Sequence, residues 1–170
     1  FSDSDLLLTA LTHASSTDSR VESNERLEFI GDAILGVIVC TELYGAFPHL
    51  LEGELTKIKS AVVSRKTCAQ ISHDLGLPKY LFLGKGMGSR SQLPNSLAAA
   101  VYESLIAAMY LDCGDLERVR RFVLDTASRH IAEASSTAHQ RNFKSQLQQH
   151  SQQFLGATPI YELLDEKGPD

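Results

Sequence analysis

Cysteine is scarce in this chain of 170 residues, and the few present form no recognisable pattern. The three cysteines, Cys40, Cys68 and Cys113, lie far apart and include no Cys-x-x-Cys pair, so no zinc site is indicated. Three cysteines cannot all pair within one chain, which favours reduced thiols and a reducing, cytoplasmic environment. We therefore expect the cysteines to be small core residues.

Long apolar runs are also lacking, which argues against a membrane protein. The richest run, residues 97–111, is interrupted by Glu103 and Ser104 and falls short of the about 20 residues that a bilayer span needs. No secretory signal is found either. Because the chain starts at Phe1 as if within a domain, we expect the natural N-terminus to lie upstream.

Positive charge is in deficit, since 16 Lys+Arg face 21 Asp+Glu and the net charge is -5. This balance weighs against a nucleic-acid ligand, because proteins that bind nucleic acid usually carry a basic surface. The argument fails where acidic residues hold metal ions, since a bound metal contributes its own positive charge. Net charge alone therefore decides little.

Helical periodicity is what the sequence does show. Apolar residues recur at intervals of three and four through residues 1–131, which predicts an all-α domain. The segment 84–96 is rich in glycine and predicts a loop, and Gly114 predicts the end of the helix that follows. Residues 132–140 lose the apolar rhythm and indicate a short linker or a frayed helix end.

Residues 141–170 predict a polar, glutamine-rich helix followed by a strand at 160–164. One helix and one strand cannot bury a core by themselves, so we expect this tail to be part of an incomplete α+β domain.

The segment Asn24–Leu35, NERLEFIGDAIL, holds the main candidates for a functional site. Glu28 and Asp32 are four residues apart and share one helical face, with apolar residues around them. Half-buried carboxylates are unfavourable unless a cation compensates them, and their hard oxygen atoms suit Mg²⁺. Gly31 costs about 1 kcal/mol of helix stability relative to alanine. Because some other interaction should offset this cost, the glycine indicates close approach to another backbone or to a ligand.

Glu103 is the third candidate, because it lies alone on a helix made largely of alanine and leucine. The small residues around it allow a second helix to pack closely, so Glu28, Asp32 and Glu103 could form one acidic pocket. The alternative, from spacing alone, is a surface stripe of solvated acids favoured by the dipole at a helix start.

At these residues the sequence resembles the ribonuclease III family. The segment 24–35 is similar to the family's signature stretch, and residues 11–15, 53–57 and 102–112 match further family segments in the same order. The resemblance covers essentially the whole chain. It implies an all-α endonuclease domain over residues 1–131 that forms a homodimer and cleaves double-stranded RNA. It further implies Mg²⁺, with Mn²⁺ as a substitute, a role in rRNA and mRNA precursor processing, and no small-molecule substrate.

The resemblance also implies roles for individual residues. Glu28, Asp32 and Glu103 correspond to three of the family's four metal-binding, catalytic carboxylates. The fourth is an aspartate, and this chain has Ala100 there. We favour a working three-carboxylate site with an extra water; the alternative is a catalytically impaired homologue that binds double-stranded RNA. A third alternative is that Ala100 is an introduced substitution that keeps the protein in an inactive form.

Phe29 and Gly31 are the candidates for the dimer interface, with a plain core position for Phe29 as the alternative.

In the tail, four polar residues fall on one helical face: Ser145, Gln148, Gln149 and Gln152. Such neutral groups suit 2′-hydroxyls and base edges in an RNA minor groove, and a merely solvated face is the alternative. The region resembles the first helix and strand of a double-stranded-RNA-binding domain. Lys85 and Arg90 of the glycine-rich loop could contact phosphate, with ordinary solvated side chains as the alternative. Four other basic residues are expected to be mostly surface groups that aid solubility: Lys57, Lys59, Arg65 and Lys66.

Overall fold

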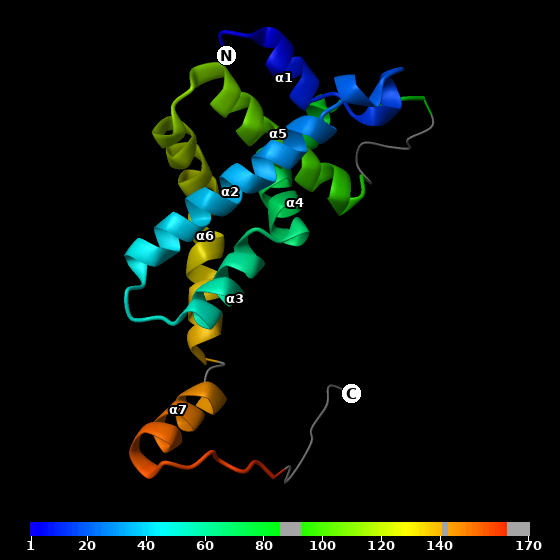
Figure 1. Ribbon diagram of the computed structural model, residues 1–170. Helices are drawn as coiled ribbons and strands as arrows, with labels where there is room; N and C mark the ends of the chain where they lie inside the picture. Colours follow the sequence, from blue (N-terminus) through cyan, green and yellow to red (C-terminus); the bar gives the residue numbers. More distant parts are fainter. Residues whose placement is uncertain (86–92, 141–142, 163–170) are drawn as a thin grey trace. The chain divides into compact units, whose positions relative to one another are not determined.

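The computed structural model describes residues 1–85, 93–140 and 143–162, without the side chains of 137–140, 143–146 and 149. Two compact units are present, Phe1–Ser135 and Ser136–Asp170. The longer helices are α1 (Ser4–Ala10), α2 (Glu25–Ala46), α3 (Glu52–Val62), α4 (Arg65–Asp74), α5 (Asn95–Cys113), α6 (Leu116–Gln140) and α7 (Phe143–Leu155) (Figure 1). Short 3-10 turns are η1 (Ala14–Ser16), η2 (Arg20–Glu22) and η3 (Leu77–Tyr80).

Within the described residues the first unit contains no strand, only an isolated parallel bridge between Thr12 and Phe82. The prediction of an all-α first domain is therefore confirmed for the part of the chain that the structure describes.

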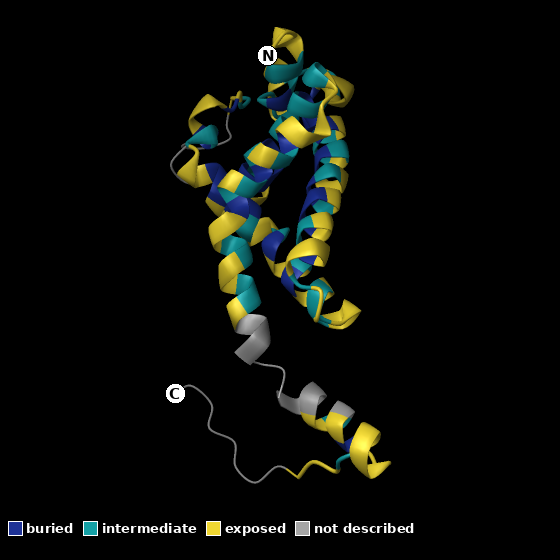
Figure 2. Cartoon of the chain, turned by 90° about the vertical axis from the view of Figure 1, so that its left-hand side faces the viewer, coloured by how far each residue is buried: buried dark blue, intermediate teal, exposed yellow. Residues whose placement is uncertain are grey.

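Helix α5 is the centre of the first unit, and α2 and α4 pack against it most extensively. Its alanines are buried, which lets neighbouring helices approach closely. Tyr102 is fully buried, and its hydroxyl shares a 2.8 Å hydrogen bond with Thr126 of α6. Figure 2 shows the buried residues of this unit gathered where its helices face one another, whereas the second unit is mostly exposed.

Local capping explains where the key helices begin and end. The Ser64 hydroxyl accepts a 3.2 Å hydrogen bond from the Thr67 N–H and so caps the start of α4. Gly114 ends α5 in the left-handed region, with φ of 63°, and its N–H donates to the Tyr110 carbonyl, as the sequence predicts.

Helices α2 and α5 are long and apolar enough to cross a membrane by length and composition alone. More than half of the apolar stretch of α5, 56%, is buried inside the protein, which is typical of the core helix of a globular domain. The corresponding share for α2 is 28%, because three large apolar residues of α2 are exposed, Phe29, Val37 and Tyr44. The expected absence of a membrane role stays a prediction.

Two expectations need correction, and one pair of alternatives is decided. Residues 132–140, expected to be a short linker or a frayed helix end, are helical, because α6 continues to Gln140, and the two compact units divide within this segment. Alanine and glutamate are good helix formers, and local backbone bonds sustain the helix without an apolar stripe. Residues 160–162 are not in a strand, and residues 163 and 164 lie outside the described part. Of the cysteines, only Cys68 is buried, whereas Cys40 is exposed and Cys113 is intermediate.

Candidate active site

A close crossing of α2 and α5 builds the site. Gly31 of α2 is buried against the backbone of Glu103, and a Cβ atom on residue 31 would lie 1.8 Å from the Glu103 carbonyl oxygen. Only glycine fits at such a distance. The neighbours of Gly31 on the pocket side, Glu28 and Asp32, are thereby brought next to Glu103. The close approach predicted from Gly31 is therefore confirmed, and its partner is a backbone.

The three predicted carboxylates line one open pocket of about 680 Å³. Helix α2 contributes Glu28 and Asp32, and α5 contributes Glu103. The remaining lining residues come from α2, α5, the end of α3 and the start of α4: Glu25, Phe29, Ala33, Val63, Arg65, Ser96 and Ala99. Four carboxylates and one guanidinium therefore face this space, and its net character is strongly acidic.

Burial and crowding disfavour the charged form of two of these carboxylates. The pKa of Glu103 is raised from 4.5 to about 7, first by burial and then by the negative charges of Glu28 and Asp32. The pKa of Glu28 is also raised, mainly by burial, with smaller contributions from Glu25 and Asp32. A cation in the pocket would relieve this repulsion.

Cys68 of α4 lies near Glu103 on the interior side of the site. It is fully buried, and burial, followed by the charge of Glu103, raises the pKa of its thiol to about 12, so the sulfur keeps its proton. The nearby thiol in turn lowers the pKa of Glu103, although burial dominates.

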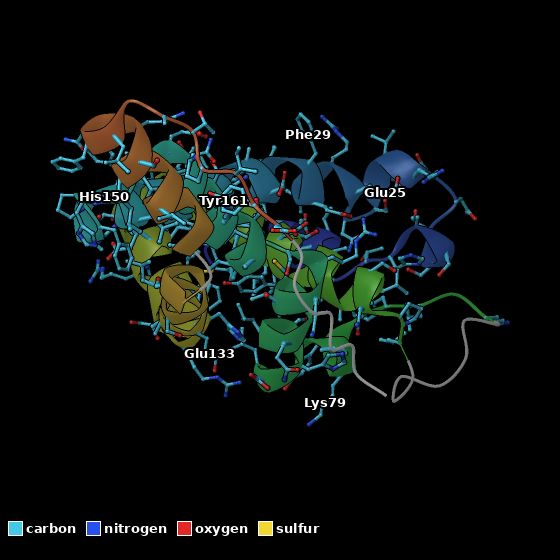
Figure 3. The ribbon with its side chains drawn as sticks, turned by 90° about the horizontal axis from the view of Figure 1, so that it is seen from below. Glu25, Phe29, Lys79, Glu133, His150 and Tyr161 are labelled. Atoms are coloured by element: carbon cyan, nitrogen blue, oxygen red, sulfur yellow. The ribbon has the colours of Figure 1, made fainter. Side chains whose placement is uncertain are left out.

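At the pocket rim, Glu25 is already paired with a cation from the preceding 3-10 turn. The Arg20 Nε donates a 3.1 Å hydrogen bond to Glu25 Oε2, and a second Arg20 nitrogen contacts the other carboxylate oxygen. This pairing lowers the pKa of Glu25. Figure 3 shows Glu25 and Phe29 along α2. The pocket's acidity therefore rests mainly on Glu28, Asp32 and Glu103.

The residues present fit a hydrated Mg²⁺. Within the described residues, no three carboxylate, imidazole or thiol groups lie close enough together to hold an ion as they stand. Carboxylates that carry like charges repel one another, so without a cation their side chains favour positions farther apart. Mg²⁺ keeps several waters and is usually held by one or two carboxylates, so an acidic pocket with room for water suits it, and Mn²⁺ has the same oxygen preference.

Residue 100 contributes nothing to the pocket surface. Ala100 is 7% exposed and is not among the lining residues; α5 presents Ser96 and Ala99 there in addition to Glu103. Because both of these side chains are uncharged, no residue of α5 replaces the aspartate that the resemblance implies at position 100.

The two candidates for a dimer interface separate in the structure. Phe29 is 80% exposed, so its alternative reading as a core residue is wrong. Gly31 cannot belong to a dimer interface, because it is buried against Glu103 of the same chain. Helical rotation explains the difference, since residues two apart point to nearly opposite faces.

The tail candidates lie on α7 but are only partly described. The side chains of Ser145 and Gln149 are outside the described set, Gln148 is intermediate in exposure, and Gln152 is exposed. Ser151, next to Gln152, is buried, and its hydroxyl donates a 2.8 Å hydrogen bond to the Ala157 carbonyl. A role for these four residues in RNA binding stays a prediction.

Sequence reasoning missed the contribution of α4 to the site. Arg65 was expected to be a solubilising surface group and Cys68 a plain core residue, yet Arg65 lines the pocket and Cys68 lies near Glu103. Their distance in sequence from residues 24–35 gives no signal of this. The sequence does place Cys68 in a helix that begins with two basic residues, Arg65 and Lys66, but it does not show which other helix they face.

Comparisons with known proteins agree with this picture. The ribonuclease-III-like family matches residues 3–131, a range that holds every residue lining the pocket. Ribonuclease 3 of Rhodopirellula baltica is 47% identical over 170 residues, covering 100% of this chain and 64% of the relative. Ribonuclease 3 of Symbiobacterium thermophilum is 39% identical over 171 residues, covering 99% of this chain and 72% of the relative. The chain thus spans less than two thirds of the Rhodopirellula protein.

The fold is also similar to a solved structure of the nuclease domain of ribonuclease III from Campylobacter jejuni. The two share 33% sequence identity with a TM-score of 0.65, over 79% of this chain and 90% of the other. That structure is described as showing flexibility in a region involved in dimer formation. The resemblance carried by residues 24–35 is confirmed, and the chain belongs to the ribonuclease III-like family.

Proposed function

We propose that this protein is a Mg²⁺-dependent endoribonuclease that cleaves double-stranded RNA. The observation that carries the proposal is that Glu28, Asp32 and Glu103 line one pocket at the Gly31 crossing, inside the range matched by the family. Its proposed substrates are structured RNA precursors in the cytoplasm, including the precursors of rRNA and mRNA.

The roles inferred for the three carboxylates come from the family resemblance and are supported by the pocket that they share. Asp32 and Glu103 would be the principal ligands of Mg²⁺, and Glu28 would complete the set. When bound, the ion supplies activation of a water for attack on the phosphodiester and stabilisation of the leaving 3′ oxygen, which gives 5′-phosphate and 3′-hydroxyl ends. The chain's own contribution is to position the carboxylates, which α2 and α5 hold on either side of their close crossing at Gly31.

A homodimer is part of this proposal, with each subunit cleaving one strand. The support is an exposed apolar stripe along α2, defined by Phe29, Val37 and Tyr44, which are 80%, 55% and 79% exposed. These residues recur on one side of the helix. Large exposed apolar residues grouped in this way are typical of protein interfaces. The Campylobacter nuclease domain, with its dimer-forming region, is similar in fold.

Ala100 favours one second candidate, a homologue that binds double-stranded RNA without cleaving it. It would keep the fold and the RNA-facing side chains proposed on α7, Ser145, Gln148, Gln149 and Gln152, but would hold metal too weakly for catalysis. The three remaining carboxylates in one pocket favour the enzyme.

Cleavage of a long RNA duplex in Mg²⁺ tests the proposal. We expect the parent protein to cut the duplex and Glu103→Gln to lose at least 100-fold in rate, on the order of the loss seen when one transition-state-stabilising group is removed. The matched control is Glu52→Gln, an exposed glutamate at the start of α3, which should cleave normally. If parent and Glu52→Gln bind the duplex but do not cut it, the binding protein is the correct interpretation.

A further inference from the structure

One lining residue of the pocket has no role in holding a cation, because it is itself a cation. Arg65 is the single basic residue among the lining residues, where it faces the space shared by Glu28, Asp32 and Glu103. Its positive charge lowers the pKa of both Glu28 and Glu103, which shows that the guanidinium acts on the same space.

Two other arginines that contact residues of α2, Arg20 and Arg120, are already engaged, whereas Arg65 is not. Arg20 is paired with Glu25, and Arg120 is paired with Glu42 at 2.6 Å. Within the described residues, no hydrogen bond or ion pair involves the guanidinium of Arg65. Its side chain is exposed, and its donors are therefore available to a ligand.

The position of Arg65 in α4 adds to this availability. It is the first residue of the helix, after the capping Ser64, so its own backbone N–H points out of the helix start. A helix start carries partial positive charge and favours anions. The planar guanidinium fork also matches the oxygen atoms of a phosphate.

We propose that Arg65 contacts a non-bridging oxygen of the phosphodiester that lies against the carboxylate pocket, and that it is a catalytic residue of this chain. This inference rests on the proposed function and adds a protein cation to it. A fixed positive charge is useful here, since phosphate carries negative charge into a pocket that presents four carboxylates. A guanidinium also stabilises charge that grows on the phosphate oxygens during attack.

The competing explanation is that Arg65 only offsets repulsion among the carboxylates. In that case lysine would replace it fully, and RNA contacts would not change with its removal. A phosphate contact, by contrast, depends on the fork geometry and releases a counterion from the RNA.

The test compares Arg65→Ala, Arg65→Lys and Lys66→Ala in cleavage of a defined RNA duplex in Mg²⁺. Lys66 is the matched control, because it is the next residue of α4, carries the same charge, is exposed and does not line the pocket. We expect kcat/KM to fall about tenfold or more in Arg65→Ala, as for loss of a charge-assisted hydrogen bond. Arg65→Lys should lie between Arg65→Ala and the parent, and Lys66→Ala should stay within about twofold, with melting temperatures unchanged because both residues are exposed.

Binding of the same duplex, measured in a Glu103→Gln background at several salt concentrations, gives a second readout. Loss of one phosphate contact should reduce the slope of log K against log salt by about 1 in Arg65→Ala and leave it unchanged in Lys66→Ala. If Arg65→Ala matches the parent in both slope and kcat/KM, the inference is wrong while the nuclease proposal stands. If Arg65→Ala lowers the salt slope of binding as expected but the parent never cuts the duplex, the phosphate contact of Arg65 stands and the nuclease proposal fails. If no duplex is bound or cut, both fail.

Discussion

Gly31 of α2 lies so close to the carbonyl of Glu103 in α5 that a Cβ atom there would be 1.8 Å from the oxygen. The same contact sets the distance between the two helices that carry the carboxylates. Stability and site geometry are therefore joined at one residue pair, and a change at residue 31 should affect both.

Gly31→Ala should be strongly destabilising, because backbone atoms of α5 must move to admit the methyl group. We expect a loss of about 3 kcal/mol in the free energy of unfolding, which is the upper part of the range for overpacking. The control is Gly45→Ala near the end of α2, where a Cβ would meet nothing within 4 Å. That variant should be neutral or slightly stabilised by higher helix propensity. Equal urea denaturation midpoints for the two variants would contradict the close crossing.

Sequence alone predicts the part of the site that lies within single helices. Glu28 and Asp32 share a face by their spacing, and the glycine between them indicates a close neighbour, as the structure confirms. Arg65 and Cys68 could not be found this way, because α4 reaches the pocket only through its packing against α5. The spacing of residues in the sequence shows which side chains share a face of one helix, whereas these contacts depend on how the helices pack together.

Glu103→Gln should stabilise the metal-free protein at high pH. The pKa of Glu103 is about 7 in the folded protein and 4.5 ordinarily, so the folded state binds more protons between these pH values. The free energy of unfolding of the parent therefore falls as pH rises through this window, and glutamine abolishes the loss. Because the carboxylate is partly exposed, screening reduces the effect to about 1 kcal/mol at pH 8, vanishing below pH 4.5.

Denaturation in chelator at several pH values checks this prediction, with Glu52→Gln as the control that should follow the parent. If the free energy of unfolding varies with pH in the same way for Glu103→Gln and the parent, the pKa of Glu103 is not raised in the folded state.

Mg²⁺ should stabilise the parent by mass action, because only the folded chain brings the carboxylates together. At pH 8 and a Mg²⁺ concentration of 100 times the dissociation constant, the gain should be about 2.7 kcal/mol. The gain should be smaller at pH 6, where Glu103 is largely protonated and must release its proton to bind. Thermal melts with and without Mg²⁺ measure it, and an equal rise in Glu103→Gln would exclude Glu103 as a ligand.

Phe29→Glu should shift the protein toward monomer. Phe29 is 80% exposed on the α2 stripe, so a charge there is tolerated by the isolated fold but becomes unfavourable inside a dimer interface. Tyr80→Glu is the matched control, since Tyr80 is also a largely exposed aromatic residue, 64%, but lies in η3. Sedimentation velocity at several protein concentrations distinguishes the two. A Phe29→Glu protein that dimerises like Tyr80→Glu would place the interface elsewhere.

Ala100→Asp should exchange stability for metal affinity. Ala100 is 7% exposed and one helical turn before Glu103, so an added carboxylate without metal would be buried and unpaired. We expect metal-free Ala100→Asp to lose about 1–3 kcal/mol in the free energy of unfolding. With Mg²⁺ the new carboxylate would gain a cation as partner, so its melting temperature should rise by more than that of the parent. Cleavage at limiting Mg²⁺ should also be faster. Ala100→Asn, nearly the same in size but uncharged, should share the loss and not the gain. If the two variants respond to Mg²⁺ alike, residue 100 does not face the metal, and the three-carboxylate site is complete as it stands.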